Sequence, residues 1–317
     1  MKTAKVFIPI LISILFVYLA IKDLSFSKVA TAFSDISWGW IFASFVAGIL
    51  AFVLRVIRWG YFFEKLPSFP SLLSAFLIGL MVNNILPARI GEIVRVFVLK
   101  KKEGISVSTS FATVILERIF DGLVVFLFFL VLLFICPFPR KIKVMGVIIT
   151  GVYILALIFL ILLKANKGFL VQKIGFISQR LAHILNSFSS GLSILHSLRK
   201  LFVIIVFSIA SWSICGFSFY LGLPAFSISL PVYVGFFVLV MAVVGVMIPA
   251  APGYIGTYQY FCILALKIFG VDENIAFSYS IVLYVISFFP TTIAGITFLF
   301  IEGLSFHELF KLKKEKV

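Results

Sequence analysis

Residues 83–95 of this 317-residue chain have the sequence NNILPARIGEIVR. Two asparagines, a proline, a glycine, two arginines and a glutamate fall within thirteen positions, between two stretches that are otherwise strongly apolar. Inside a bilayer an unpaired backbone group is very costly, so a non-helical break survives only where protein or a water-filled cavity surrounds it. We therefore interpret this stretch both as a break in the fold and as a functional site.

The composition excludes a soluble globular domain. Hydrophobic residues make up 62% of the chain and charged residues only 12%, whereas soluble domains carry roughly a quarter charged residues. The net charge of +15 comes from basic residues between apolar segments, where they orient the chain and meet anionic lipid, so we expect no nucleic-acid partner. The three cysteines lack metal-ligand spacing, and we expect no metal and no cofactor.

Apolar segments predict an all-α polytopic membrane protein. Six stretches are predicted to be full transmembrane helices, at about 6–20, 38–59, 107–136, 144–163, 201–223 and 275–301. Two further stretches, 71–99 and 230–269, are each interrupted, and neither half of the first reaches the roughly twenty residues that a crossing requires. We therefore predict about six full transmembrane helices plus two re-entrant or broken helix hairpins.

The basic residues also predict the orientation. With both termini in the cytoplasm, the loops at 55–65, 100–102 and 164–200 are cytoplasmic, and only the basic residues at 140–143 disagree. We expect an integral protein of the cytoplasmic membrane. Re-entrant hairpins and pairs of full crossings place the loops on the same sides of the membrane. The distribution of basic residues therefore does not distinguish between them. Residues 164–200 have helical apolar periodicity, as in an amphipathic helix on the membrane surface or a linker packed on the bundle.

The two breaks resemble each other. Residues 87–92 (PARIGE) align with residues 252–257 (PGYIGT) at an offset of 165, and Gly104 and Gly270 follow at 166. In the predicted topology the two hairpins enter from opposite sides, which is the inverted repeat of many transporters. We predict one membrane domain over 1–317, with repeat 1 at about 38–136, repeat 2 at about 201–301 and a cytoplasmic amphipathic segment at about 165–199 between them.

The half-helix ends predict an anion site. Pro87 and Pro252 suit the first turn of a half-helix, where the missing amide hydrogen is not needed. Each end then presents free N–H groups and a partial positive charge, which bind anions, and Arg89 adds a fork of donors that fits phosphate. The alternative is a proline kink whose charges pair with one another.

A second charged motif follows in the span 107–136. Glu117 lies about 15 Å from its start at about 1.5 Å per residue, near the middle of a bilayer core of about 30 Å. A charge there costs at least about 2.5–3.5 kcal/mol, so Glu117, Arg118 and Asp121 need partners. Three arginines and three carboxylates can neutralise one another without substrate: Arg89, Arg95 and Arg118 against Glu92, Glu117 and Asp121. An entering phosphate would take the arginines, and protonation of a freed carboxylate makes proton-linked movement a hypothesis.

Three motifs together resemble a known family. Asn-x-x-x-Pro-x-Arg-x-Gly-Glu at 83–92, Glu-Arg-x-x-Asp at 117–121 and Pro-x-x-Pro-Gly-x-x-Gly at 249–256 are similar to motifs of the flippase-like membrane domain of lysylphosphatidylglycerol synthases and related bacterial and archaeal proteins. The resemblance implies movement of lipids or lipid-linked head groups between leaflets. The chain departs from the family at Gln259, where a carboxylate is common, and at 281–289, which has no basic residue. The synthases' aminoacyl-transferring domain is not matched, so we expect no synthase activity.

The predicted roles fall into three groups. Substrate-binding residues are Arg89, Arg95, Arg118, Asn83, Asn84, Thr257, Gln259 and, through head groups at the cytoplasmic interface, Arg58. Residues for charge balance or proton relay are Glu92, Glu117 and Asp121. Residues that shape the half-helices are Pro87, Gly91, Pro249, Pro252, Gly253 and Gly256.

These roles predict translocation of an anionic phospholipid or a lipid-linked substrate, such as one on polyprenyl phosphate, between leaflets. Alternatives are a secondary transporter for a small anion, a non-catalytic membrane partner of a lipid-modifying glycosyltransferase, and an enzyme acting on lipid phosphate. The enzyme is disfavoured because the sequence shows no metal-ligand cluster and no motif that pairs a serine or cysteine nucleophile with a histidine. A membrane lipid is the expected partner, and a lipid-modifying enzyme is a second candidate.

Overall fold

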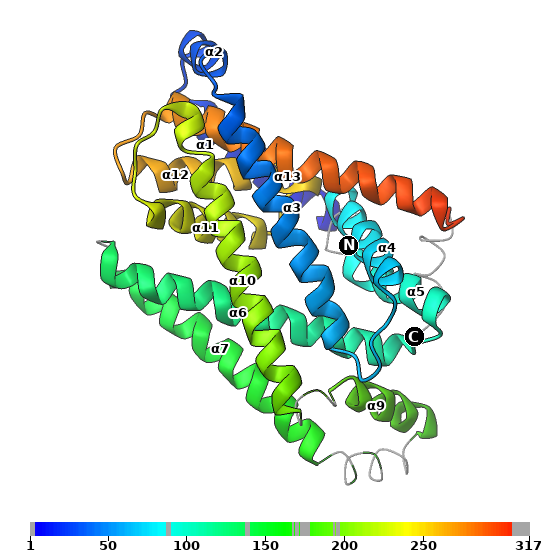
Figure 1. Cartoon of the computed structure of the whole chain (residues 1–317). Coiled ribbons are helices and arrows are strands. Elements are labelled where there is room, and N and C mark those ends of the chain that lie inside the picture. The colour runs from blue at the N-terminus through cyan, green and yellow to red at the C-terminus, as the bar shows by residue number, and fades with distance from the viewer. Residues whose placement is uncertain are drawn as a thin grey trace. The chain divides into compact units, whose positions relative to one another are not determined.

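In a computed structural model, the residues described are 4–86, 90–136, 140–166, 168, 171, 178–192, 194 and 197–305, and they form helices without a β-strand (Figure 1). The α-helices are α1 (Ala4–Ile21), α2 (Phe26–Ser34), α3 (Trp38–Tyr61), α4 (Phe69–Ile85), α5 (Gly91–Glu103), α6 (Val107–Ile135), α7 (Arg140–Ala165), α9 (Gln179–Gly191), α10 (Leu198–Leu221), α11 (Val232–Met247), α12 (Thr257–Lys267) and α13 (Glu273–Ile301). Two short 3-10 turns are η3 (Pro224–Phe226) and η4 (Pro252–Tyr254). The all-α prediction is confirmed for the described residues.

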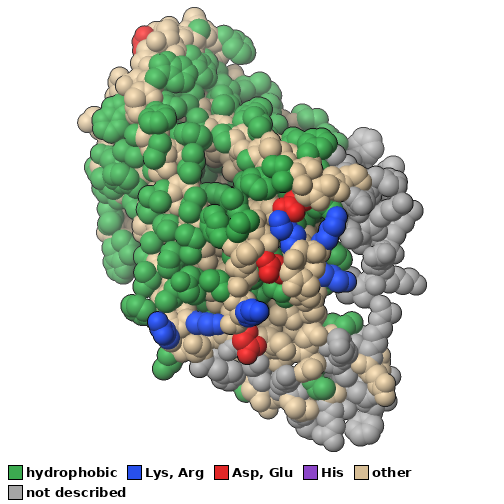
Figure 2. Space-filling view, turned by 45° about the vertical axis from the view of Figure 1, so that its right-hand side comes forward, with side chains coloured by type: hydrophobic (Ala, Val, Ile, Leu, Met, Phe, Trp, Pro, Cys, Tyr) green, Lys and Arg blue, Asp and Glu red, His purple; other side chains and the backbone are tan. Residues whose placement is uncertain are grey.

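Four helices in the described part of the chain are long and apolar enough to cross a membrane: α3, α6, α10 with its continuation to Phe226, and α13. They cover the predicted spans 38–59, 107–136, 201–223 and 275–301. At most 33% of the apolar window of each helix is buried inside the protein, so broad apolar faces are left for lipid. Figure 2 shows a face on which hydrophobic side chains cover most of the described surface and charged ones gather in a limited region.

Two further predicted spans are also helical. Helix α7 covers 144–163, and α1 covers 6–20. Helix α2 follows α1 after a bend of 80°, so the pair is either a broken span or a re-entrant segment. None of the residues of α2 is buried.

Helix α6 carries one of the charged motifs and is fixed at its start. Ser106 caps the helix by accepting a hydrogen bond from the Thr109 backbone N–H at 3.0 Å. The side chains of Ser108 and Thr109 donate to backbone carbonyls of α9, at Ile184 (2.8 Å) and Ser187 (2.9 Å). Over residues 179–191 the structure thus favours a helix packed on the bundle; much of 164–200 otherwise lies outside the described residues.

The first break is an antiparallel hairpin of α4 and α5. Ser68, just before α4, donates its hydroxyl to Glu103 at the end of α5 at 2.7 Å. At the other end the Asn83 side chain accepts from the Gly91 backbone N–H at 2.8 Å. Glu92 in the first turn of α5 and lysines 100–102 in its last turn complement the helix dipole. Pro87 lies outside the described residues, so its first-turn role stays a prediction.

The second break is also an antiparallel hairpin, formed by α11 and α12. The Phe237 and Phe269 rings lie 5.4 Å apart at one end, and the backbone of Gly245 approaches that of Thr257 at the other. One prediction was wrong here: Pro252 begins the separate turn η4, and α12 starts five residues later. The physical reason is that Gly253 and Gly256 have φ of +76° and +92°, which a continuing α-helix cannot contain.

Helices of similar length occur twice in the same order. Helices α3, α4, α5 and α6 have 24, 17, 13 and 29 residues, and α10, α11, α12 and α13 have 24, 16, 11 and 29. Both half-helices α5 and α12 are followed by a glycine with positive φ, Gly104 at +69° and Gly270 at +77°.

The chain forms two compact units that interleave along the sequence. One comprises residues 1–51, 80–91 and 213–297 and includes the second break. Its core contains Phe237, Cys262 and Tyr279. The other comprises residues 52–79, 92–212 and 298–317, and its core contains Trp59 and Leu116. The charged residues of α5 and α6 belong to this second unit.

Candidate functional site: a buried cluster of ion pairs

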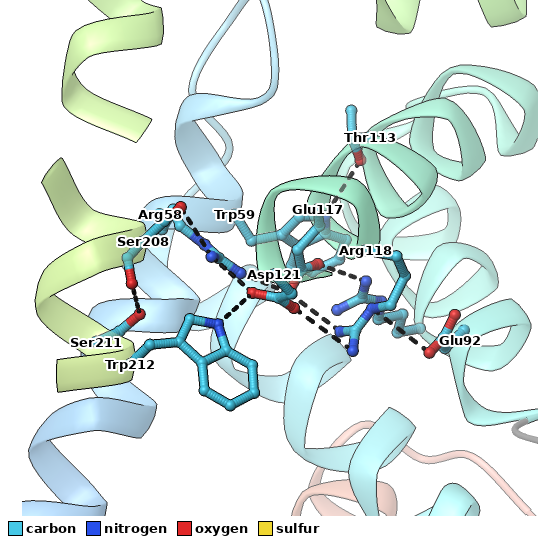
Figure 3. Close-up of polar contacts among 11 residues, drawn as sticks. Arg58, Trp59, Glu92, Thr113, Glu117, Arg118, Asp121, Ser208, Ser211 and Trp212 are labelled. Atoms are coloured by element: carbon cyan, nitrogen blue, oxygen red, sulfur yellow. Dashed lines mark hydrogen bonds and ion pairs between the residues drawn. The ribbon is translucent and has the colours of Figure 1, made fainter. Parts of the chain in front are cut away.

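A cluster of arginines and carboxylates lies in the second unit, centred on Glu117 of α6 (Figure 3). The Glu117 side chain is fully buried and accepts from Arg58 Nη2 at 3.3 Å, Arg95 Nη2 at 2.5 Å and Arg118 Nη2 at 3.3 Å. Three guanidinium groups from α3, α5 and α6 therefore share one carboxylate.

Asp121, one turn further along α6, is the second centre. Arg58 Nη1 lies 2.8 Å from its carboxylate, and the Trp212 indole N–H donates to the same oxygen at 2.8 Å. Arg118 Nη1 lies 3.6 Å from the other oxygen. Arg58 Nη1 also donates to the Ser208 hydroxyl at 2.9 Å. Residues of α10 therefore hold this end of the cluster.

Two aromatic rings contact the Arg95 guanidinium in addition to its carboxylate partner Glu117. Its guanidinium carbon lies 4.7 Å from the centre of the Trp59 ring and 5.1 Å from that of Phe76. The Trp59 indole donates to the Thr113 hydroxyl at 3.1 Å, which fixes the ring. Cation–π contact of this kind stabilises a desolvated guanidinium.

Arg118 forms the accessible edge of the cluster. Its guanidinium reaches three carboxylates, with Nε 3.5 Å from Glu92 in addition to the contacts with Glu117 and Asp121. Nevertheless 40% of its side chain is exposed, and 21% of that of Glu92. The cluster is thus closed around Glu117 and open at Arg118.

Of the predicted internal pairs, those of Arg95 and Arg118 with Glu92, Glu117 and Asp121 are present among the described residues, and the predicted role of Arg58 is corrected. The sequence predicted that Arg58 meets head groups at the interface, but its side chain is fully buried and bridges Glu117 and Asp121. Its position on α3 directs it at α6, where two carboxylates compensate the cost of burying its charge. Arg95, a predicted phosphate ligand, is also buried against Glu117. Arg89 lies outside the described residues.

The two asparagines of the first break have structural partners. Asn83 caps α5, as described above, and the Asn84 amide donates to the Thr292 hydroxyl of α13 at 2.8 Å. Both belong to the first unit. Substrate binding by Asn83 and Asn84 remains a prediction. To bind substrate, each asparagine would have to give up the hydrogen bond described here.

Side chains from outside the second break satisfy its backbone. Ser13 of α1 donates to the Ile255 carbonyl and accepts from the Ala251 N–H, both at 2.9 Å. Tyr284 of α13 donates to the Gly253 carbonyl at 2.9 Å. A break in a membrane needs such partners.

The other predicted residues of the second break also make local contacts. The Gln259 side chain accepts from the Gly256 N–H at 2.8 Å, and the Thr257 hydroxyl donates to the Tyr254 carbonyl at 3.1 Å. Both side chains are buried, while Pro249 and Pro252 are exposed. The described residues of this break include no charged side chain.

The sequence interpretation missed Arg55 and Trp212 as neighbours of the cluster and Ser13 as a partner of the second break. A usable signal existed for Arg55, since a charge inside a predicted span demands a partner. None existed for Trp212 or Ser13, which look like ordinary members of apolar helices. Within the described residues, no group of three or more His, Cys, Asp or Glu side chains could hold a metal ion.

Comparisons with known proteins agree with this fold class. The family model described as the lysylphosphatidylglycerol synthase TM region matches residues 6–295. A UPF0104 membrane protein of Methanocaldococcus jannaschii is 32% identical over 224 residues, which cover 68% of this chain and 92% of the relative. A UPF0104 membrane protein of Methanothermobacter thermautotrophicus is 24% identical over 314 residues, 94% of each chain. No solved structure matches the chain.

Proposed function

The chain belongs to the family of the lysylphosphatidylglycerol synthase TM region, and from this premise we propose that it moves an anionic phospholipid, or another lipid-linked anion, between membrane leaflets. The expected setting is the cytoplasmic membrane with both termini in the cytoplasm. The proposal assigns the chain no covalent chemistry.

The observation that carries the proposal is the partial exposure of Arg118. This residue follows the start of α6 by eleven positions, about 16 Å at about 1.5 Å per residue. A charge at such depth costs about 2.5–3.5 kcal/mol or more, and its three carboxylates offset that cost. Because 40% of the side chain is nevertheless exposed, although its Nε is buried, we infer that a negatively charged head group reaches the Arg118 guanidinium within the span.

An anion can bind Arg118 at a small energetic cost if it replaces the carboxylates that now pair with this arginine. A phosphate that binds Arg118 replaces contacts to Glu92, Glu117 and Asp121 that lie at 3.3–3.6 Å, longer than the best charge-assisted hydrogen bonds of about 2.7–2.9 Å. The shorter Arg95–Glu117 pair stays in place. Glu92, the most exposed of the three carboxylates, is the candidate for proton uptake in a proton-linked version.

The repeated order of helix lengths supports a transporter rather than a scaffold. Two runs of a long helix, two half-length helices and a 29-residue helix fit the predicted inverted repeat, and transporters place binding sites at broken helices in such repeats. The first run holds the charged cluster, and the described part of the second break lacks charges. We therefore propose that the two repeats contribute unequally, the first by binding the anion.

Reconstitution tests the proposal. The purified full chain is placed in liposomes with labelled phosphatidylglycerol, and in a second set with a labelled polyprenyl phosphate, and leaflet exchange is measured with and without a pH gradient. Wild type should accelerate exchange of at least one anionic lipid. Arg118→Gln should slow it at least about tenfold, the equivalent of about 1.4 kcal/mol.

The matched control is Arg199→Gln, which makes the same change at an exposed arginine at the start of α10. Its exchange rate should equal that of wild type. Arg118→Lys keeps the charge but loses the paired guanidinium donors, so its exchange rate should lie between those of wild type and Arg118→Gln. This variant replaces Arg118→Gln in the test if the glutamine variant does not fold. Unchanged exchange in folded Arg118→Gln would contradict the proposal, no exchange by wild type would favour the membrane partner, and uptake of free phosphate without lipid exchange would favour the small-anion transporter.

A further inference from the structure

Arg55 is an arginine of the second unit that the ion-pair cluster does not use. It lies on α3 three residues before Arg58, on the same side of the helix, and six residues before the end of α3, about 9 Å at about 1.5 Å per residue. Its Nε and Nη2 atoms are buried, and neither has a hydrogen-bond partner within the described part of the chain. Ion pairs involve Arg58, Arg95 and Arg118 but, among the same residues, not Arg55.

An aromatic ring fixes the position of this guanidinium. The guanidinium carbon of Arg55 lies 4.2 Å from the centre of the Trp212 ring, within the range of a cation–π contact. Trp212 is itself held, because its indole N–H donates to Asp121 at 2.8 Å and its side chain is buried. Arg55 is therefore placed beside the cluster, close enough for Coulombic attraction to Asp121, but without an ion pair among the described residues.

The described charges do not balance. Four guanidinium groups, those of Arg55, Arg58, Arg95 and Arg118, face three carboxylates, and all three carboxylates already contact another arginine. A partly desolvated cation without an ion-pair partner is unfavourable in a protein and more so in a membrane. An anion from outside the described residues would remove this penalty.

We propose that Arg55, stacked on Trp212, is the residue that receives the phosphate group of the substrate; the inference rests on the proposed function and names its ligand chemistry. Nε and Nη2 form one edge of the guanidinium plane and carry parallel N–H donors, the geometry that binds two oxygens of one phosphate. These are the two atoms without partners. The side chain as a whole is only half-buried, so rotation about its aliphatic torsions brings this edge out.

Arg55 suits first contact better than Arg95 does. Arg95 donates to Glu117 at 2.5 Å and is almost fully buried, so a phosphate would have to break a charge-assisted bond to reach it. Within the described part of the chain, Arg55 has no ion pair that a phosphate would have to break. From Arg55 the anion can then engage Arg118, which contacts Asp121, the carboxylate that also holds Trp212.

An equilibrium binding measurement tests this assignment independently of transport. Phosphatidylglycerol in nanodiscs of otherwise zwitterionic lipid is titrated against the purified full chain, and inorganic phosphate is used as a competitor in a parallel series. Arg55→Gln should weaken binding at least about tenfold, and Arg55→Lys, which keeps the charge without the paired donors, should weaken it less. Arg199→Gln should bind like wild type.

The melting temperature separates binding from a structural role. If Arg55 serves the ligand, Arg55→Gln removes a cation that has no ion pair among the described residues, and the melting temperature without anionic lipid stays the same or rises. An affinity within twofold of wild type would overturn the inference, whether or not the melting temperature falls. If inorganic phosphate binds through Arg55 but phosphatidylglycerol does not, the lipid as the source of the phosphate is overturned. Lipid binding that depends on Arg55, without leaflet exchange, would support the inference and contradict the proposed function.

Discussion

At the scale of the residue, Glu117 determines how the buried charges are arranged. One carboxylate accepts from Arg58, Arg95 and Arg118, and these side chains come from three helices. Replacing a whole buried ion network with apolar residues is often tolerated, but removal of one partner leaves uncompensated charge and is strongly destabilising. The cluster therefore constrains α3, α5 and α6 as well as supplying a binding edge.

Glu117→Gln should lower the free energy of unfolding by about 3–5 kcal/mol, because the amide keeps the shape but leaves three guanidinium groups sharing Asp121 and Glu92. The measurement is denaturant or thermal unfolding of the full chain in detergent. Glu64→Gln is the control, since Glu64 is exposed in the loop after α3 and its side chain lies outside the cluster. Equal stability of the two variants would show that the network around Glu117 is not formed.

At the scale of the element, each broken segment depends on groups that satisfy its backbone. Asn83 does this for the start of α5, and Ser13 and Tyr284 do it for the turn before α12. Glycines make the second turn possible: a Cβ on Gly256 would lie 2.8 Å from the Ser13 carbonyl oxygen and 2.8 Å from the Val17 nitrogen. Helix α1 thus packs directly against the break.

Two glycine variants separate backbone strain from this packing. Gly104→Ala should cost about 1–2 kcal/mol, the cost of a left-handed conformation for a residue with a Cβ, because Gly104 has φ of +69° and open space around it. Gly256→Ala, at φ of +92°, should cost clearly more, because the Cβ also collides with the backbone of α1.

Unfolding curves of both variants in the same detergent provide the measurement. Similar losses of stability in the two proteins would mean that α1 does not approach the second break as closely as the structure places it.

At the scale of the whole molecule, the main question is how the two hairpins lie in the membrane. Helices α4 and α5, with 17 and 13 residues, and α11 and α12, with 16 and 11, are each shorter than the roughly twenty residues of a full crossing. We infer from these lengths that both hairpins are re-entrant and turn within the membrane. Ile85 and Ile255 are exposed hydrophobic residues at the two turns and are suitable reporters.

Cysteine labelling in sealed vesicles of known orientation tests the re-entrant arrangement. A membrane-impermeant maleimide should label Ser229→Cys, before α11, from the outside and Glu64→Cys, after α3, from the cytoplasmic side. Ile85→Cys should resist labelling from the outside, and Ile255→Cys from the cytoplasmic side, until detergent is added. Rapid labelling of either turn from that side would mean that its hairpin crosses the membrane completely.

The sequence by itself determined the all-helical membrane class, the positions of four spans and both breaks, and the need for internal charge pairing. These follow from local properties: apolar run length, proline and glycine at the breaks, and the cost of charge in lipid. Only the tertiary structure decided which groups meet. It put Arg58 in the cluster instead of at the interface. It stacked Arg55 on Trp212 without an ion pair to any other described residue. It also showed that Ser13 hydrogen-bonds to a break more than 230 residues away. Such pairings depend on how helices pack against one another, and no pattern of neighbouring residues encodes them.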